Sequence, residues 1–147
     1  MLTGAFTRPS GAETLDLQYH IAAMHEAPIT VAFVDLDDFK SVNDSFGHDE
    51  GDRVLQAMAE SLRSCLRRGD ALIRWGGEEF LLVLGNTDPL GARLVVQRLR
   101  EKGFGVRPDG AALTASIGVA ERIKDGTLDW PQLVELADKR MYDAKNS

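Results

Sequence analysis

The sequence has little of several features that mark other classes of protein. Cys65 is its single cysteine among 147 residues, so an internal disulfide and a cysteine zinc cluster are both excluded. No apolar run approaches the roughly 18 residues that a membrane span requires. The amino-terminal segment also lacks the basic start and apolar core of a signal peptide. We therefore expect a cytoplasmic segment that does not itself contact a membrane.

Basic residues are fewer than acidic ones. Lysine and arginine number 17 against 23 acidic residues, which gives a formal charge of −6. This balance argues against a broad surface for nucleic acid, although a local pocket for a nucleotide phosphate stays open. The apolar content of 44% and the charged content of 27% are ordinary for a globular protein. The length suits a single domain over residues 1–147 with one core.

Hydrophobic periodicity predicts most of the helices and strands. A first helix over 13–26 carries Leu17, Ile21 and Met24 at helical spacing. The β-branched run 29–34 is typical of a central strand that is covered on both faces and ends at Asp35. Later segments predict a helix over 54–66 stopped by Gly69, a helix over 92–99 ended by Gly103, a strand over 113–119, and a last helix that Asp129 caps.

The segment between 71 and 84 predicts a β-hairpin. Two apolar runs flank the pair Gly76-Gly77, and glycine adopts the positive φ angles of a tight turn without steric penalty. Glu78 and Glu79 then lie at or beside the tip. Adjacent acids repel each other at neutral pH, so a cation is their natural partner. The competing interpretation is a pair of solvated acids.

The order strand, helix, strand, strand, helix, strand is that of a ferredoxin-like βαββαβ core. We therefore expect an α/β (α+β) fold with a central, mostly antiparallel sheet and extra terminal helices. In such a sheet the end of the first strand lies beside the hairpin, which brings Asp35 near Glu78 and Glu79. Magnesium, held by these carboxylates and by substrate phosphates, would balance their charge. Phosphate-transfer chemistry is the leading hypothesis.

Several motifs in a fixed order resemble one known family. They are Asp35-Leu36-Asp37-Asp38-Phe39-Lys40, Asn43, Gly47-His48, Gly51-Asp52, Gly76-Gly77-Glu78-Glu79-Phe80, Ala115-Ser116-Ile117-Gly118-Val119-Ala120, Ala137-Asp138 and Tyr142-Asp143-Ala144-Lys145. Together with Leu2-Thr3-Gly4 they cover nearly the whole chain and resemble the GGDEF family of diguanylate cyclases. The resemblance implies a nucleotidyl-cyclase-like enzyme that condenses two GTP molecules into cyclic di-GMP and releases two pyrophosphates. Each domain would hold one GTP, so two copies must face each other as a homodimer.

The resemblance also implies a metal site. Asp35 would bind Mg²⁺ or Mn²⁺ through its carboxylate and Leu36 through its carbonyl oxygen, while Glu78 completes the site. Glu79 would join a second ion. By the same resemblance Asp35, Glu78 and Glu79 are the catalytic residues, and Glu78 matches the position often argued to be the base.

Other matched positions imply contacts with the nucleotide. Asn43 and Asp52 match the guanine-reading pair, since an amide and a carboxylate complement the guanine edge. The alternative is that they are turn and N-cap residues. Phe39 and Lys40 match the loop around the phosphates, and Lys145 matches a phosphate-binding lysine. The family pattern continues beyond Lys145 into a Gly-Arg segment, which this sequence does not include.

An inhibitory product site is implied by Arg67 and Asp70, which match the family's Arg-x-x-Asp pattern, with Arg98 as a second arginine for cyclic di-GMP. A helix C-terminus with Gly69 as its cap explains the same residues, and both interpretations can hold together. Asp37 and Asp38 are structural candidates that could support the metal ligands. No role is assigned to His48.

Two other functions remain open. A catalytically silent domain that binds GTP or cyclic di-GMP would usually have a damaged hairpin motif, whereas Gly76 to Phe80 is intact. Another nucleotidyl cyclase or polymerase-like transferase would share the acids but not Asn43, Asp52 and the Arg67 to Asp70 pattern. We expect the domain to have been excised from a longer protein, in which an upstream sensory or receiver module controls pairing.

Overall fold

The computed structural model describes residues 4–147, so Leu2 and Thr3 of the matched amino-terminal motif lie outside the described residues. A four-stranded sheet forms the centre, with every neighbouring pair antiparallel and the order β2-β3-β1-β4. The elements are α1 (Arg8–Met24), β1 (Ile29–Leu36), α2 (Phe39–Phe46), α3 (His48–Ser64), β2 (Ala71–Arg74), β3 (Glu79–Gly85), α4 (Pro89–Lys102), β4 (Ala115–Glu121), α5 (Arg122–Asp125) and α6 (Trp130–Lys145). The predicted ferredoxin-like core is confirmed, with α1 and α6 as the terminal helices.

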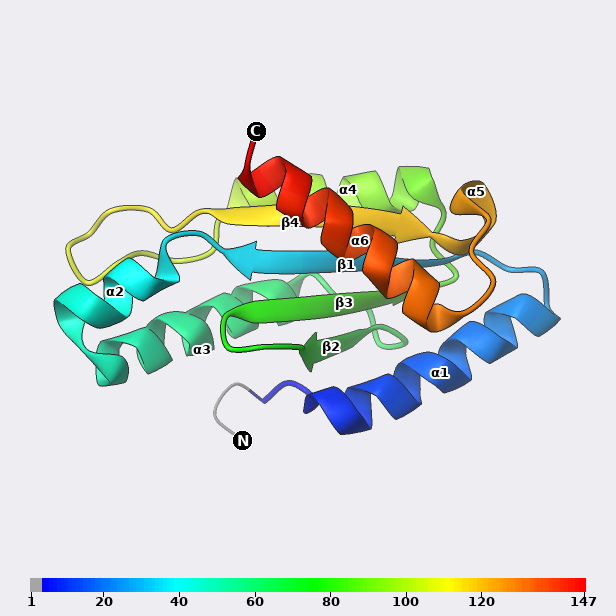
Figure 1. The fold of residues 1–147 in the computed structure, drawn as a ribbon, viewed down its shortest axis with the longest axis horizontal. Helices are drawn as coiled ribbons and strands as arrows, with labels where there is room; N and C mark the ends of the chain where they lie inside the picture. Colours follow the sequence, from blue (N-terminus) through cyan, green and yellow to red (C-terminus); the bar gives the residue numbers. More distant parts are fainter. Residues whose placement is uncertain (1–3) are drawn as a thin grey trace.

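Helices cover both faces of the sheet, as Figure 1 shows, with α3 and α4 behind it and α1 and α6 in front. Each face therefore has its own apolar core. The core behind the sheet includes Leu82 and Phe80, whereas the core in front includes Phe33 and Leu81. All eight residues of β1 are buried, as expected for a central strand. The expectation of one core is thus replaced by two layers of packing that share the sheet.

The first helix packs with a different face from the predicted one. Its buried side chains include Leu15 and Tyr19, while Leu17, Ile21 and Met24 are 60%, 46% and 67% exposed. Two apolar stripes run along this helix, and the periodicity of either one satisfies a helical pattern. The helix also begins earlier than predicted, at Arg8, where the Thr7 side chain accepts a hydrogen bond from the Ser10 amide.

Several predicted boundaries were wrong by a few residues. Asp35 does not end β1, because the strand continues through Leu36. The third helix was predicted over 54–66 with Gly69 as its stop, whereas it spans His48–Ser64. The fourth strand is shifted by two residues and runs to Glu121. The predictions that Gly103 ends α4 and that Asp129 caps α6 are confirmed.

Two short helices were not predicted. The α2 helix spans two turns and buries only Val42, so it offers no repeat from which a period can be recognised. The α5 helix has four residues and is capped by Glu121, whose carboxylate accepts from the amides of Ile123 and Lys124. Short helices of this kind depend on capping and tertiary contact rather than on an apolar stripe.

Gly118 explains how closely α6 lies on the sheet. A Cβ atom at this position of β4 would collide with the carbonyl oxygen of Ala137 and the amide of Met141, both backbone groups of α6. Only glycine therefore allows the helix to rest directly on the strand. The end of α6 is thereby held over the ends of the central strands, where Lys145 reaches Asp35.

Candidate active site

The end of β1 and the start of β3 bring the predicted acids together. Asp35 and Glu79 are direct partners across the two strands, and the amide of Leu36 donates to the carbonyl oxygen of Glu78 at 3.2 Å. Asp35 is buried, while Glu78 and Glu79 are half-buried. The antiparallel register of a central strand with its hairpin neighbour thus places three carboxyl groups in one small region, as the topology predicted.

The glycine pair serves a different purpose from the predicted one. Neither Gly76 nor Gly77 has a positive φ angle, so turn strain does not require glycine there. Instead, a Cβ atom on Gly76 would collide with the carboxylate of Glu79. Gly76 therefore makes room for that side chain. Nothing lies within 4 Å of a Cβ placed on Gly77.

Arg74 braces the loop between β2 and β3, a role that the sequence did not reveal. Its guanidinium donates to the carbonyl oxygen of Gly77 at 2.8 Å and, more weakly, to that of Gly76 at 3.4 Å. Trp75 packs edge-on against Trp130 with ring centroids 6.1 Å apart, and Arg8 lies over its ring. The available signal was an arginine two residues before a glycine pair.

Crowded negative charge is the main electrostatic feature of the site. Partial burial raises the pKa of Glu79 above its ordinary value, and the nearby carboxylates of Asp35 and Asp138 raise it further. Burial and Asp35 likewise raise the pKa of Asp138 on α6. Asp138 lay within a matched motif but had been assigned no role. A cation in this region would relieve the repulsion.

Lys145 supplies part of that positive charge. Its ammonium donates to Oδ1 of Asp35 at 2.9 Å and lies 3.7 Å from Oδ1 of Asp37. Burial lowers the pKa of Lys145, but the hydrogen bond and charge of Asp35 outweigh it, so the pKa is raised overall. Asp37 is held in turn by the hydroxyls of Thr114 and Ser116, each at 2.8 Å. Asp37 therefore ties β1 to β4.

The acids fit a hard divalent cation by their chemistry, since carboxylate and carbonyl oxygens are the ligands that Mg²⁺ prefers. Among residues 4–147, however, no group of three His, Cys, Asp or Glu side chains stands in an arrangement that could hold a metal ion. Asp35 is engaged by Lys145 instead. The donor set is thus present and electrostatically strained, with an ammonium bound to its most buried member.

The predicted guanine-reading residues lie on two adjoining helices. Asn43 belongs to α2, and its side-chain oxygen occupies the space that a Cβ on Gly51 would fill. Asp52 follows Gly51 in the second turn of α3. Neither residue caps a helix, because the N-caps are Asp38 and Gly47. The structure therefore contradicts the alternative interpretation of Asn43 and Asp52 as turn and N-cap residues.

Phe39 and Lys40 open α2 rather than forming a loop. Asp38 precedes them in the left-handed conformation, with φ of 57°, and its side chain does not cap the helix. The backbone amides in the first turn of α2 therefore have no side-chain cap. Such a helix start favours anions, which is consistent with a phosphate nearby.

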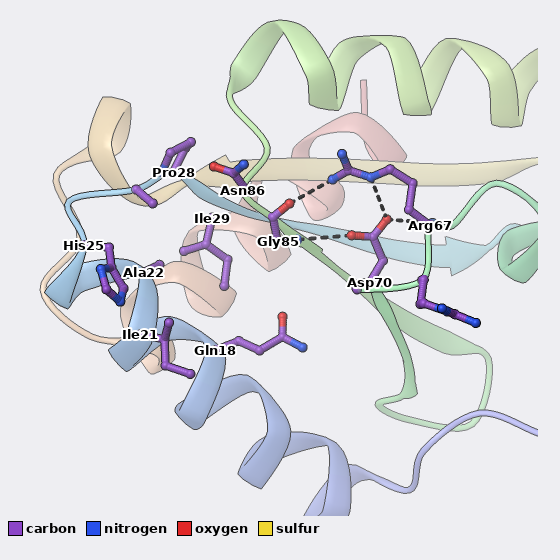
Figure 2. A pocket seen from close by; sticks show the side chains of 13 residues that line it. Gln18, Ile21, Ala22, His25, Pro28, Ile29, Arg67, Asp70, Gly85 and Asn86 are labelled. Atoms are coloured by element: carbon purple, nitrogen blue, oxygen red, sulfur yellow. Dashed lines mark hydrogen bonds and ion pairs between the residues drawn. The ribbon is translucent and has the colours of Figure 1, made fainter.

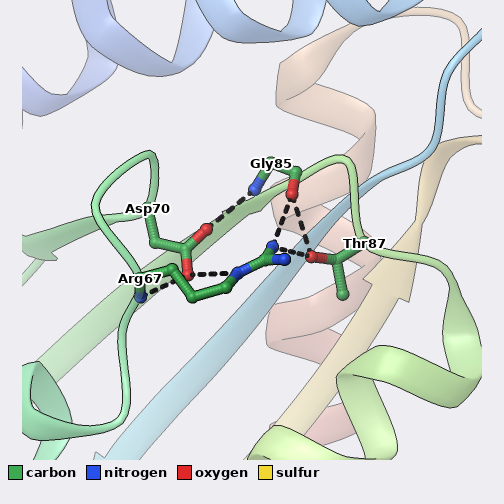
Figure 3. Close-up of polar contacts among 4 residues, drawn as sticks. All are labelled: Arg67, Asp70, Gly85 and Thr87. Atoms are coloured by element: carbon green, nitrogen blue, oxygen red, sulfur yellow. Dashed lines mark hydrogen bonds and ion pairs between the residues drawn. The ribbon is translucent and has the colours of Figure 1, made fainter.

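Arg67 and Asp70 form a compact network at the far end of β3, shown in Figure 3. The Asp70 carboxylate accepts from the amide of Gly85 at 3.2 Å and from that of Arg67 at 2.9 Å. The Arg67 guanidinium donates to the Gly85 carbonyl at 2.8 Å and to the Thr87 hydroxyl at 2.7 Å. The Asp70 side chain is 2% exposed, whereas that of Arg67 is 63% exposed. Asp70 is structural, and Arg67 faces solvent.

Two of the cavities that adjoin this network lie on its α1 and α4 sides. Arg67 and Arg98 line one of about 370 Å³ beside α4, so the two predicted product-site arginines share one hollow. The other, of about 490 Å³, is lined mainly by apolar groups of α1 and the start of β1, with Asp70 and Gly85 at its far wall (Figure 2). The fold therefore brings Arg98 to Arg67 although 31 positions of sequence separate them.

Comparison with known proteins identifies the family. The family model described as "Diguanylate cyclase, GGDEF domain" matches residues 1–147. The chain belongs to the GGDEF family. Diguanylate cyclase DgcM of Escherichia coli strain K12 is 40% identical over 118 residues, which cover 80% of this chain and 28% of that protein. The chain spans about a third of the length of the curated relatives it matches, from 28% to 33%.

Solved structures agree with this assignment. Diguanylate cyclase SiaD of Pseudomonas aeruginosa, solved in complex with its activator SiaC, gives a TM-score of 0.88 at 39% identity, over 99% of this GGDEF chain and 56% of that chain. The GGDEF domain of DgcB from Caulobacter crescentus, solved in complex with cyclic di-GMP, gives 0.89 at 26% identity, over 99% and 86% of the two chains. No helix in the described part of the GGDEF domain has the length and apolar character needed to span a bilayer.

Proposed function

We propose that this GGDEF domain is a diguanylate cyclase that joins two GTP molecules into cyclic di-GMP. The observation that carries the proposal is the convergence of Asp35, Glu78 and Glu79 beside the uncapped start of α2. Carboxylates at this edge suit a metal-assisted phosphoryl transfer, and the helix start suits a phosphate. The intact Gly76 to Phe80 segment favours this function over a catalytically silent binding domain.

The residues take roles that follow from their chemistry. Asp35, the Leu36 carbonyl and Glu78 would hold Mg²⁺ or Mn²⁺, with Glu79 beside them. The bound cation would neutralise charge on the α-phosphate and on the departing pyrophosphate. Glu78 would accept the proton of the attacking 3′-hydroxyl, and Lys145 would bind a phosphate. Asn43 and Asp52 would select guanine because adenine presents mismatched donors and acceptors.

Two domains must meet, since each holds one GTP and contributes one half of the product. We propose that cyclic di-GMP then binds in the cavity between Arg67 and Arg98 and inhibits the enzyme. Two arginines from different elements can grip the phosphates with bidentate hydrogen bonds. An upstream module in the full-length protein would control pairing of the domains. A domain that uses GTP as its substrate would work in the cytoplasm.

The test is incubation of the purified chain with GTP and Mg²⁺ at several protein concentrations, followed by chromatography of the nucleotides. We expect cyclic di-GMP to form with a steeper than linear dependence on protein concentration, and to vanish with chelator or in Glu78→Ala. Glu60→Ala removes an exposed glutamate of α3 and serves as the matched control. Asn43→Ala should reduce the preference for GTP over ATP. Failure to form product at any concentration, with cyclic di-GMP still bound, would favour the silent domain.

A further inference from the structure

In the structure Lys145 contacts Asp35, although we assign Asp35 to the metal ion and Lys145 to a nucleotide phosphate. Its ammonium is 2.9 Å from Oδ1 of Asp35, the carboxylate that we assign to the metal ion. The same lysine is assigned to a nucleotide phosphate. The Asp35 side chain is only 10% exposed, and the Lys145 ammonium already occupies one of its two oxygens, Oδ1.

A divalent cation bound to either oxygen of Asp35 would lie close to this ammonium. The ion binds carboxylate oxygens at about 2.1 Å, while the lysine hydrogen bond occupies a lone pair of Oδ1. Two positive charges so close together repel strongly in a partly buried site. Asp37 does not resolve the conflict, because the Thr114 and Ser116 hydroxyls already hold its two oxygens.

We propose that Lys145 is an internal counter-cation that a divalent metal ion displaces from Asp35, and that this displacement frees its ammonium to bind the nucleotide phosphate. The inference rests on the proposed metal-binding role of Asp35. The Lys145 side chain is 35% exposed and stands at the last residue of α6, where its flexible stem can swing without unfolding the helix. Metal binding and phosphate binding are thereby coupled through one side chain.

Removal of the Lys145 charge should therefore change two affinities in opposite directions. Metal binding in the absence of nucleotide should become stronger, and binding of GTP should become weaker. The experiment measures Mn²⁺ binding to nucleotide-free protein by the electron paramagnetic resonance signal of the free ion. Lys145→Met keeps the apolar stem and removes the charge. We expect it to bind Mn²⁺ about five-fold more tightly than the natural protein, the upper range for a partly exposed ion pair. Its affinity for GTP with Mg²⁺ should fall.

Two variants control for net charge and for folding. Lys139→Met removes an exposed lysine of the same helix and should leave Mn²⁺ affinity unchanged. Lys145→Gln replaces Lys145→Met if the latter does not fold. Unchanged or weaker Mn²⁺ binding in the Lys145 variants would overturn the counter-cation role and leave the cyclase proposal intact. Mn²⁺ binding that is absent in every variant, or that survives Asp35→Asn, would overturn the metal role of Asp35 and the inference with it.

Discussion

Asp35 and Glu79 are direct partners across the antiparallel pair of β1 and β3. Directly opposite side chains lie on the same face of a sheet, and like charges in this position destabilise the pair. The fold therefore maintains an electrostatic penalty at the edge where we place the chemistry. Strain of this kind is a frequent property of functional sites.

The raised pKa of Glu79 predicts a pH-dependent cost in stability. Glu79→Gln should raise the Tm at neutral pH in buffer that contains a chelator. Because the pKa in the folded state lies above the ordinary value of 4.5, the penalty is absent below that pH and grows as the pH rises through the raised pKa. The Tm difference between the variant and the natural protein should widen from acidic to neutral pH. Glu60→Gln, an exposed control, should show no such trend, and a constant or reversed difference would contradict the argument.

The close contact of α6 with Gly118 predicts a strong response to a single added methyl group. Gly118→Ala should lower the free energy of unfolding by about 1–3 kcal/mol, since the backbone of α6 must move to admit the Cβ. Urea denaturation measures this change. Gly69→Ala is the matched control, because nothing lies within 4 Å of its Cβ and its φ angle is not positive. Equal costs for the two variants would refute the packing explanation.

The two apolar stripes of α1 can be separated by mutation. Leu15→Ala should cost about 2–5 kcal/mol, because Leu15 is 0% exposed in the front core. Leu17→Ala removes a side chain that is 60% exposed and should change stability by less than about 0.5 kcal/mol. The free energies of unfolding of both variants, measured by urea denaturation, show which face of α1 is buried. A larger cost for Leu17→Ala would restore the interpretation drawn from the periodicity.

Arg67 and Asp70 should respond differently although they share a motif. Asp70→Ala leaves the amides of Arg67 and Gly85 without their acceptor and should cost about 1–2 kcal/mol. Arg67→Ala should cost less than about 1 kcal/mol, since its side chain is 63% exposed. If the proposed product site is correct, Arg67→Ala should weaken cyclic di-GMP binding about ten-fold or more.

Calorimetry measures the predicted loss of cyclic di-GMP binding, and urea denaturation measures the predicted loss of stability. Arg98→Ala should weaken cyclic di-GMP binding in the same manner, because Arg98 lines the same cavity as Arg67. It should not lower stability, because Arg98 is exposed on α4. Full cyclic di-GMP affinity in both arginine variants would exclude this cavity as the product site.

Much of the fold could be predicted from local sequence patterns. The buried run of β1, the hairpin and the Asp129 cap all depend on neighbours a few residues away, and all three were predicted. The α2 helix was missed because its two turns bury only Val42. Gly76 was assigned a turn angle, whereas its absent side chain makes room for Glu79. A space requirement of this kind depends on where another side chain lies.

By itself the sequence determined the βαββαβ order of the core elements and hence the sheet, since periodicity and turn residues act locally and the chirality and length of connections leave few topologies. It also determined which acids could meet, because Asp35 and Glu79 belong to neighbouring strands. Only the tertiary structure decided which stripe of α1 is buried, since both are equally periodic. Only the tertiary structure placed Lys145 on Asp35, 110 positions away. That contact exists because Gly118 lets α6 rest on the sheet, a packing relationship with no local signature.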